Sequence, residues 1–169
     1  MKTVKATARG FTLIELLVTL GLVGLVASVS LPLFEVTSTR IREAELRQAL
    51  RTIRTALDAY KAASDTGDIH KEAGESGYPP SLDRLTEVID IGARTDSIVV
   101  SADPPKRIQI LRQLPRDPFF PDPSVPAAQT WNVRAYASRS DDPQPGPDVY
   151  DVSSKSQRNG LDGTPYAAW

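Results

Sequence analysis

The sequence predicts an α+β protein in which one long N-terminal helix packs on a small antiparallel β-sheet. An apolar run from Phe11 to Phe34 has the length of a membrane-spanning helix, and residues 35–63 continue it with a helical apolar stripe. Thirteen of the fourteen prolines lie at or after position 79. Short segments of alternating apolar and polar residues in that second half are typical of strands.

Charge is unevenly distributed along the 169 residues. The formal net charge is -1, yet Lys2, Lys5 and Arg9 place +3 on the first ten residues, which contain no acid. The remaining chain is therefore acidic and lacks the basic footprint of a nucleic-acid-binding protein. There is no cysteine, which excludes disulfides, thiolate catalysis and cysteine-based metal sites.

The apolar run holds 24 residues with one formal charge. A helix of this length spans about 36 Å at about 1.5 Å per residue, which exceeds the hydrocarbon core of about 30 Å. A secretory signal peptide has an apolar region of only about 7 to 15 residues. The run therefore predicts a single membrane pass. The simplest alternative is a plain anchor in which Glu15 is incidental.

Glu15 is the one charged residue of the run and needs a partner. A carboxylate at the centre of a membrane helix costs about 2.5 to 3.5 kcal/mol, and less near the interface. Arg9 and Lys5 are candidate partners within the chain. Cleavage after Gly10 would create another, because the new amino group of Phe11 would lie four residues before Glu15 on the same helical face. In an assembly, the amine of one copy would pair with Glu15 of the next.

The hexapeptide GFTLIE at 10–15, behind a short basic leader, resembles the prepilin-type cleavage signal of type IV pilins and pseudopilins. Pro32 stands where that family commonly places a helix-kinking proline. The resemblance implies that a prepilin peptidase cuts between Gly10 and Phe11 and N-methylates Phe11. It also implies that Glu15 pairs with a neighbouring subunit's N-terminus and sets the register of filament assembly.

This resemblance and the composition together predict four regions. They are a prepilin leader (1–10), a transmembrane and assembly helix (11–34), an amphipathic helix (35–63) and a loop-rich β domain (64–169). The family expectation is a single-pass protein of the bacterial inner membrane. Its leader would be cytoplasmic and its C-terminal domain periplasmic.

The amphipathic helix carries its apolar residues at spacings of 4, 3, 4 and 3, namely Leu46, Leu50, Ile53, Leu57 and Tyr60. We expect this stripe to cover a sheet of the same subunit. Glu43 and Arg47 form a favourable i, i+4 pair. The arginines on the opposite face are expected to be solvated, or to meet acidic patches of neighbouring subunits in a filament.

The second half is predicted to consist of loops and short strands. Residues 64–80 form a loop in which His70 is a surface residue, and a short helix follows within 78–88 with Ser81 as its N-cap. Strands are predicted over 97–101, 108–111, 131–138 and 149–152. The proline-rich stretch 141–147 separates the last two strands as a hairpin loop.

The order of several segments narrows the resemblance. Three stretches follow one another in an order similar to that in the major pseudopilin of type II secretion systems. They are GYPPSLDRL, LPRDPF (114–119) and residues 148–169, which end at Trp169. That branch implies a pseudopilus subunit that drives export of folded proteins across the outer membrane. Its implied partners are further copies of itself, the prepilin peptidase, other pseudopilins and an inner-membrane assembly platform.

The resemblance also raises calcium as a cofactor. Major pseudopilins typically hold a calcium ion in the loop after the last strand, and calcium takes about 6 to 8 oxygen ligands. Asp162 is the one clear carboxylate that this loop offers, and the groups near it in sequence are Asp151, Ser153, Ser154, Ser156 and Asn159. The alternative is a loop packed by Tyr166 and Trp169 without metal.

The favoured function is structural and not enzymatic. A minor pseudopilin and a type IV pilin share the N-terminal signal, although such pilins often carry a C-terminal disulfide. A membrane-anchored periplasmic enzyme or binding domain is the alternative of a different class. The chain contains no Gly-x-Ser-x-Gly, His-Glu-x-x-His or phosphate-binding loop. The enzyme alternative would require the acids Asp141 and Asp142, or Asp151 and Asp162, to line a pocket.

Overall fold

The structure is a computed structural model that describes residues 10–91 and 106–169. The chain divides into two compact units, residues 1–40 and 41–169, and the division falls inside the long helix α1 (Leu13–Asp65). The predicted leader residues 1–9 and the predicted strand 97–101 lie outside the described residues.

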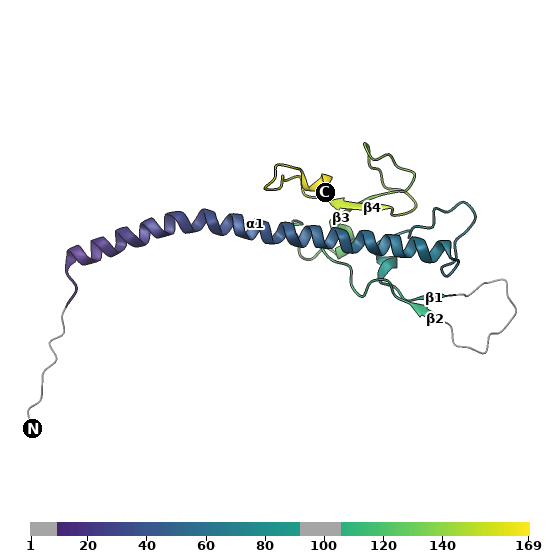
Figure 1. The fold of residues 1–169 in the computed structure, drawn as a ribbon, viewed down its shortest axis with the longest axis horizontal. Coiled ribbons are helices and arrows are strands. Elements are labelled where there is room, and N and C mark those ends of the chain that lie inside the picture. The colour runs from purple at the N-terminus through teal and green to yellow at the C-terminus, as the bar shows by residue number, and fades with distance from the viewer. Residues whose placement is uncertain (1–9, 92–105) are drawn as a thin grey trace, which may run out of the picture. The chain divides into compact units, whose positions relative to one another are not determined.

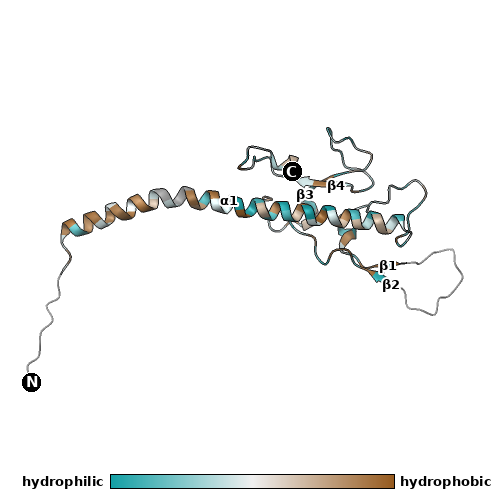
Figure 2. Ribbon diagram, in the orientation of Figure 1, coloured by the Kyte–Doolittle hydropathy of each residue, from teal (hydrophilic) through white to brown (hydrophobic). Residues whose placement is uncertain are grey.

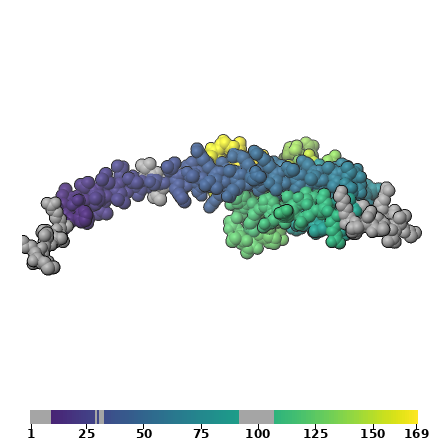
Figure 3. All heavy atoms as spheres, turned by 60° about the horizontal axis from the view of Figure 1, so that its bottom comes forward, coloured from purple at the N-terminus to yellow at the C-terminus, as the bar shows by residue number. Residues whose placement is uncertain are grey.

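The first unit consists of the N-terminal turns of α1. The large apolar side chains described in it are exposed. In Figure 2, the coloured turns toward the N-terminal end of α1 are mostly brown, the colour of hydrophobic residues. In Figure 3 the atoms of this part of the helix are the purple and dark blue spheres. By length and composition this part of α1 is able to cross a membrane. The apolar helix is consistent with membrane anchoring, as the sequence predicts.

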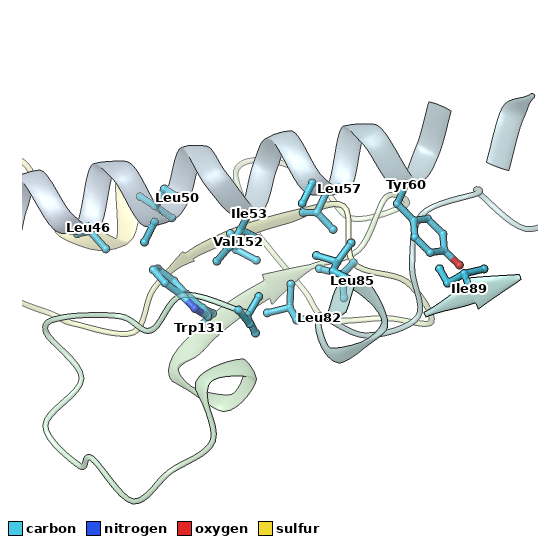
Figure 4. Close-up of a cluster of buried hydrophobic side chains, with 14 of the residues drawn as sticks. Leu46, Leu50, Ile53, Leu57, Tyr60, Leu82, Leu85, Ile89, Trp131 and Val152 are labelled. Carbon is cyan, nitrogen blue, oxygen red and sulfur yellow. The ribbon is translucent and has the colours of Figure 1, made fainter. Parts of the chain in front are cut away.

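In the second unit, α1 supplies one face of the hydrophobic core. Leu46, Leu50, Ile53, Leu57 and Tyr60 are all buried, which confirms the predicted stripe. Figure 4 shows these side chains directed toward Leu82, Leu85, Trp131 and Val152. Burying an aliphatic or aromatic side chain stabilises a fold by about 1.5 to 3 kcal/mol. The stripe is therefore a main source of stability for this unit.

Two antiparallel ladders accompany the helix (Figure 1). In the first, β1 (Ile89–Ile91) pairs with β2 (Lys106–Ile108). In the second, β3 (Trp131–Arg134) pairs with β4 (Asp151–Ser154), and Val133 lies opposite Val152. The α+β class and the antiparallel pairing of the last two strands are thus confirmed. The described strands form two two-stranded sheets instead of the single sheet that the sequence predicted.

Several local predictions were wrong in detail. The short helix after the loop is a 3-10 helix, Asp83–Thr86, and its N-cap position is Leu82, without a side-chain cap bond; Ser81 is not the cap. Strand β4 begins two residues later than predicted and β3 ends four residues earlier. Strand β1 was not predicted, because three residues are too few for the alternating pattern to stand out.

The segment LPRDPF is held in place by buried polar contacts. The Asp117 side chain is 1% exposed and accepts hydrogen bonds from the Ser154 hydroxyl at 2.6 Å and the Phe119 amide at 2.8 Å. The Trp131 indole donates to the Pro115 carbonyl at 3.0 Å. These bonds fasten the segment to β3 and β4. They satisfy polar groups whose burial would otherwise cost about 1 to 3 kcal/mol each.

Candidate functional site

The N-terminal motif lies at the first turn of α1. Gly10, Phe11 and Thr12 precede the helix, which begins at Leu13. The Thr12 hydroxyl accepts a hydrogen bond from the Glu15 amide at 3.3 Å, and the Thr12 carbonyl accepts one from the Leu16 amide at 3.2 Å. Thr12 is therefore the N-cap. A peptide bond exposed just before a capped helix is accessible to a protease.

Glu15 occupies the first turn of α1, where its negative charge interacts favourably with the helix dipole. Thr12 and Glu15 also have the Thr-x-x-Glu spacing of a capping box, a signal that the sequence analysis missed. Because Phe11 lies before the helix in the uncleaved chain, the helical i, i+4 spacing does not apply to Phe11 and Glu15 there. The expected partners Lys5 and Arg9 lie outside the described residues.

The helix continues without interruption through Pro32. Hydroxyl groups in this region return to backbone carbonyls one turn earlier: Ser28 donates to Gly24 at 2.8 Å and Ser30 donates to Val26 at 2.9 Å. Such bonds satisfy hydroxyls that lipid would leave without partners. The assembly role expected of Pro32 stays a prediction.

The second candidate site is the segment after β4, where calcium was expected. The Asp162 Oδ1 accepts hydrogen bonds from the Thr164 amide at 2.9 Å and the Thr164 hydroxyl at 2.7 Å. The hydroxyl bond, followed by the amide bond, lowers the pKa of Asp162. The loop is closed further by the Gly160 amide, which donates to the Thr164 carbonyl at 2.8 Å. Asp162 therefore shapes the loop through its own hydrogen bonds.

A buried carboxylate attaches this segment to α1. Glu43 is 4% exposed, and its Oε1 accepts hydrogen bonds from the Leu161 amide at 2.7 Å and the Tyr166 hydroxyl at 3.1 Å. Its Oε2 lies 3.8 Å from Arg47 Nη2, so the predicted i, i+4 pair is present. Close packing surrounds these bonds, since a Cβ added at Gly160 would lie 2.7 Å from the Trp169 ring.

Arg54, about three turns after Glu43 on α1, makes a second attachment. Arg54 Nε donates to Asp151 at 2.8 Å, and its Nη2 donates to the carbonyls of Val152 at 3.1 Å and Trp169 at 2.7 Å. The Arg47 guanidinium lies 4.1 Å from the centroid of the Trp169 ring. The expectation that these arginines are simply solvated is therefore wrong for Arg47 and Arg54.

Sequence reasoning missed the roles of Glu43 and Arg54, although one signal was present. Glu43 extends the apolar stripe by a further spacing of three before Leu46, so it occupies a core-facing position. A charged residue at such a position is almost never buried unless it is paired. Nothing comparable in the sequence distinguishes Arg54 from its neighbouring arginines, because its partners are about 100 residues away.

The residues around Asp162 do not fit a calcium site. Asp151, the other candidate carboxylate, is bound by Arg54 and lies 3.6 Å from Arg134. Asp162 shares a shallow groove with Arg47, Arg51 and Arg54, whose positive charges disfavour a cation. Within residues 10–91 and 106–169, no three carboxylate or imidazole side chains are grouped to hold a metal ion. Calcium binding at Asp162 stays a prediction without support from the geometry.

The acid pairs considered for an enzyme are engaged in other interactions. Asp141 pairs with Arg139 at 2.8 Å in the exposed loop between β3 and β4, and Asp142 accepts from the Gln144 amide group at 2.8 Å in the same loop. Asp151 and Asp162 each have the partners given above, and Asp162 also lines the shallow groove that contains Arg47, Arg51 and Arg54. These contacts favour a structural reading of all four acids.

One comparison with known proteins gives a match. Residues 5–31 match the family described as "Prokaryotic N-terminal methylation motif", which is the signal of type IV pilins and pseudopilins. The matched range includes Gly10, Phe11 and Glu15 and ends at Leu31. No curated protein and no solved structure shows a significant match to the chain.

The buried Tyr166 hydroxyl should make the stability of the second unit depend on pH. Burial, followed by the hydrogen bond to Glu43, raises the pKa of Tyr166. A free tyrosine in the unfolded chain ionises at about pH 10. Above that pH, Tyr166 loses its proton in the unfolded state but keeps it in the folded state. The contribution of Tyr166 to the free energy of unfolding is therefore fully present below about pH 10 and is lost as the pH rises through the pKa of the folded state.

We therefore expect Tyr166→Phe to destabilise the second unit by about 1 to 2 kcal/mol near neutral pH. The difference from wild type should shrink above about pH 10. Urea unfolding of the full chain in detergent, followed by circular dichroism from pH 7 to 11, measures both effects. Tyr136→Phe is the control, because Tyr136 is exposed. A constant difference across the pH range would contradict the assignment.

Calcium and its removal should leave the protein unchanged. Because Asp151 is held by arginines and Asp162 by Thr164, we expect the same melting temperature in excess EGTA and in excess calcium. Asp162→Ala should lower the melting temperature equally in both conditions. A calcium-dependent rise that disappears in Asp162→Ala would instead establish the calcium site that the resemblance implies.

Proposed function

We propose that this chain, which carries the prokaryotic N-terminal methylation motif, is a pilin-like subunit that polymerises through its N-terminal helix. The observation that carries the proposal is the match over residues 5–31, in which GFTLIE begins an exposed apolar helix. A prepilin peptidase would cut between Gly10 and Phe11 and methylate the new N-terminus. The protein's role is structural.

Assembly would use the same helix that anchors the subunit. Phe11 is 82% exposed, and the large apolar side chains of the next turns are more than half exposed. In the membrane, lipid covers these side chains. In a filament, the helices of neighbouring copies would replace the lipid. Glu15 would pair with the N-terminal amine of a neighbouring copy, because an unpaired carboxylate is costly in an apolar surrounding.

The finer assignment is to the pseudopilus of a type II secretion system. Its support is the order of GYPPSLDRL, LPRDPF and the C-terminal segment, together with the absence of cysteine. The subunit would sit in the bacterial inner membrane with its C-terminal domain in the periplasm. Other pseudopilins and an inner-membrane assembly platform would be its partners, and filament growth would drive folded proteins across the outer membrane.

Processing is the first consequence to test. A Cβ added at Gly10 meets nothing within 4 Å, so Gly10→Val should leave the fold intact and obstruct only the approach of the peptidase. We expect intact-mass spectrometry of the wild-type protein from native membranes to give a chain that begins at Phe11 with one added methyl group. Gly10→Val should retain Met1.

Gly24→Ala is the matched control, because a Cβ there also meets nothing within 4 Å. This variant should be processed like wild type. A wild-type chain that begins at Met1 in cells with an active prepilin peptidase would contradict the proposal. The protein would then be a plain anchored domain.

Glu15→Gln tests assembly separately from processing. The variant keeps the shape of the side chain and removes its charge, so cleavage should continue while the ion pair between subunits is lost. Because loss of one partner from a buried ion pair costs about 3 to 5 kcal/mol, we expect filament yield and secretion to fall about tenfold or more.

Thr12→Ala separates this role from helix capping, since it removes the N-cap bond to the Glu15 amide and leaves the carboxylate. Sedimentation of sheared filaments and the fraction of exported protein in the medium measure the outcome. Normal filaments in Glu15→Gln, or equal losses in Glu15→Gln and Thr12→Ala, would overturn the proposed role of the charge.

A further inference from the structure

A cavity of about 540 Å³ in the second unit has no role in filament assembly as proposed above. It lies between the last turns of α1, the loop 64–80 and the residues after β3. Its volume is in the range of about 300 to 1,000 Å³ that is typical of small-molecule sites. Three tyrosines contribute to its walls, namely Tyr60, Tyr78 and Tyr136.

Two of these tyrosines form a preorganised aromatic platform. The rings of Tyr78 and Tyr136 stack with centroids 5.8 Å apart, and both meet Tyr150 edge-on at 5.1 and 5.6 Å. Tyr136 nevertheless remains 58% exposed. Its backbone amide donates to Asp148 at 2.8 Å, which fixes its position. An exposed aromatic side chain that is held this firmly is ready to stack on a ligand at little entropic cost.

The polar lining supplies both donors and acceptors. Glu75 and Asp148 provide carboxylate oxygens, Lys71 provides an ammonium group and His70 provides an imidazole. Lys71 already pairs with Asp65 at 3.0 Å, so the lining offers no unopposed positive charge for a phosphate. Ser64 also lines the cavity, and its hydroxyl is buried without a hydrogen-bond partner among the described residues.

We propose that this cavity binds one pyranose ring of a saccharide. A sugar ring presents an apolar C–H face that stacks on an aromatic ring. Its hydroxyl groups both donate and accept, which matches a lining of carboxylates, lysine and histidine. The sugar would stack on Tyr136, and Glu75 and His70 would bind its hydroxyl groups. The inference concerns the second unit alone and does not depend on cleavage or filament assembly.

The test is isothermal titration of the full chain with two trisaccharides. The first is N,N′,N″-triacetylchitotriose, which carries N-acetyl groups, and the second is maltotriose, which does not, so the pair distinguishes an N-acetylated glycan from a plain glucan. The detergent must be a polyoxyethylene ether, because a maltoside carries a competing sugar. We expect saturable binding of at least one trisaccharide. Tyr136→Ala should weaken binding about fivefold or more, from the loss of an aromatic contact.

Tyr136→Phe should bind within about twofold of wild type, because the stacking face remains. Glu75→Gln is a second variant in the lining of the cavity. Val88→Ala is the control, at an exposed apolar residue that does not line the cavity. Reduced binding in Tyr136→Ala and Glu75→Gln with wild-type binding in Val88→Ala supports the proposal. Absence of saturable binding by either sugar, or equal binding by Tyr136→Ala and wild type, overturns it.

Discussion

The second unit depends on the burial of one stripe of α1. Its described strands form only two-stranded ladders, and an isolated two-stranded ladder is marginally stable in water. Leu50, Ile53 and Leu57 supply the apolar surface against which the loops and both ladders pack. Without α1 the remaining segments have no common core. The helix that begins as an apolar run long enough to cross a membrane therefore also provides the core-facing surface of the folded domain.

Polar contacts determine where the C-terminal segment lies on that helix. Glu43 binds Leu161 and Tyr166 in the segment that follows β4. Arg54, about three turns further along α1, binds Asp151 within β4 and the carbonyl of Trp169 at the end of that segment. Both contacts use backbone groups as well as side chains, so a shift of the segment by one residue would lose them together. The arginines bind Asp151 and Thr164 binds Asp162, the two carboxylates that a calcium ion would need. Internal hydrogen bonds and ion pairs hold this loop in place.

The N-terminal motif combines two physical roles in a few residues. Thr12 caps α1 and Glu15 places a negative charge in its first turn, which favours the helix in the uncleaved chain. A carboxylate in that position is also stabilised by a positive partner wherever lipid or other apolar helices surround it. The local role does not require assembly and the proposed role does, so variants that separate charge from capping are informative.

The sequence alone determined the features that depend on local pattern. Three such features are contiguous or periodic in the sequence: the apolar run, the GFTLIE motif and the stripe from Leu46 to Tyr60. They can be recognised from the order of residues without tertiary information. Only the tertiary structure decided which polar residues pair with one another. Glu43 meets Tyr166, and Arg54 meets Asp151, across about 100 residues or more of chain. The pairing into two ladders and the tyrosine-lined cavity were likewise decided by contacts between distant segments, which no local pattern encodes.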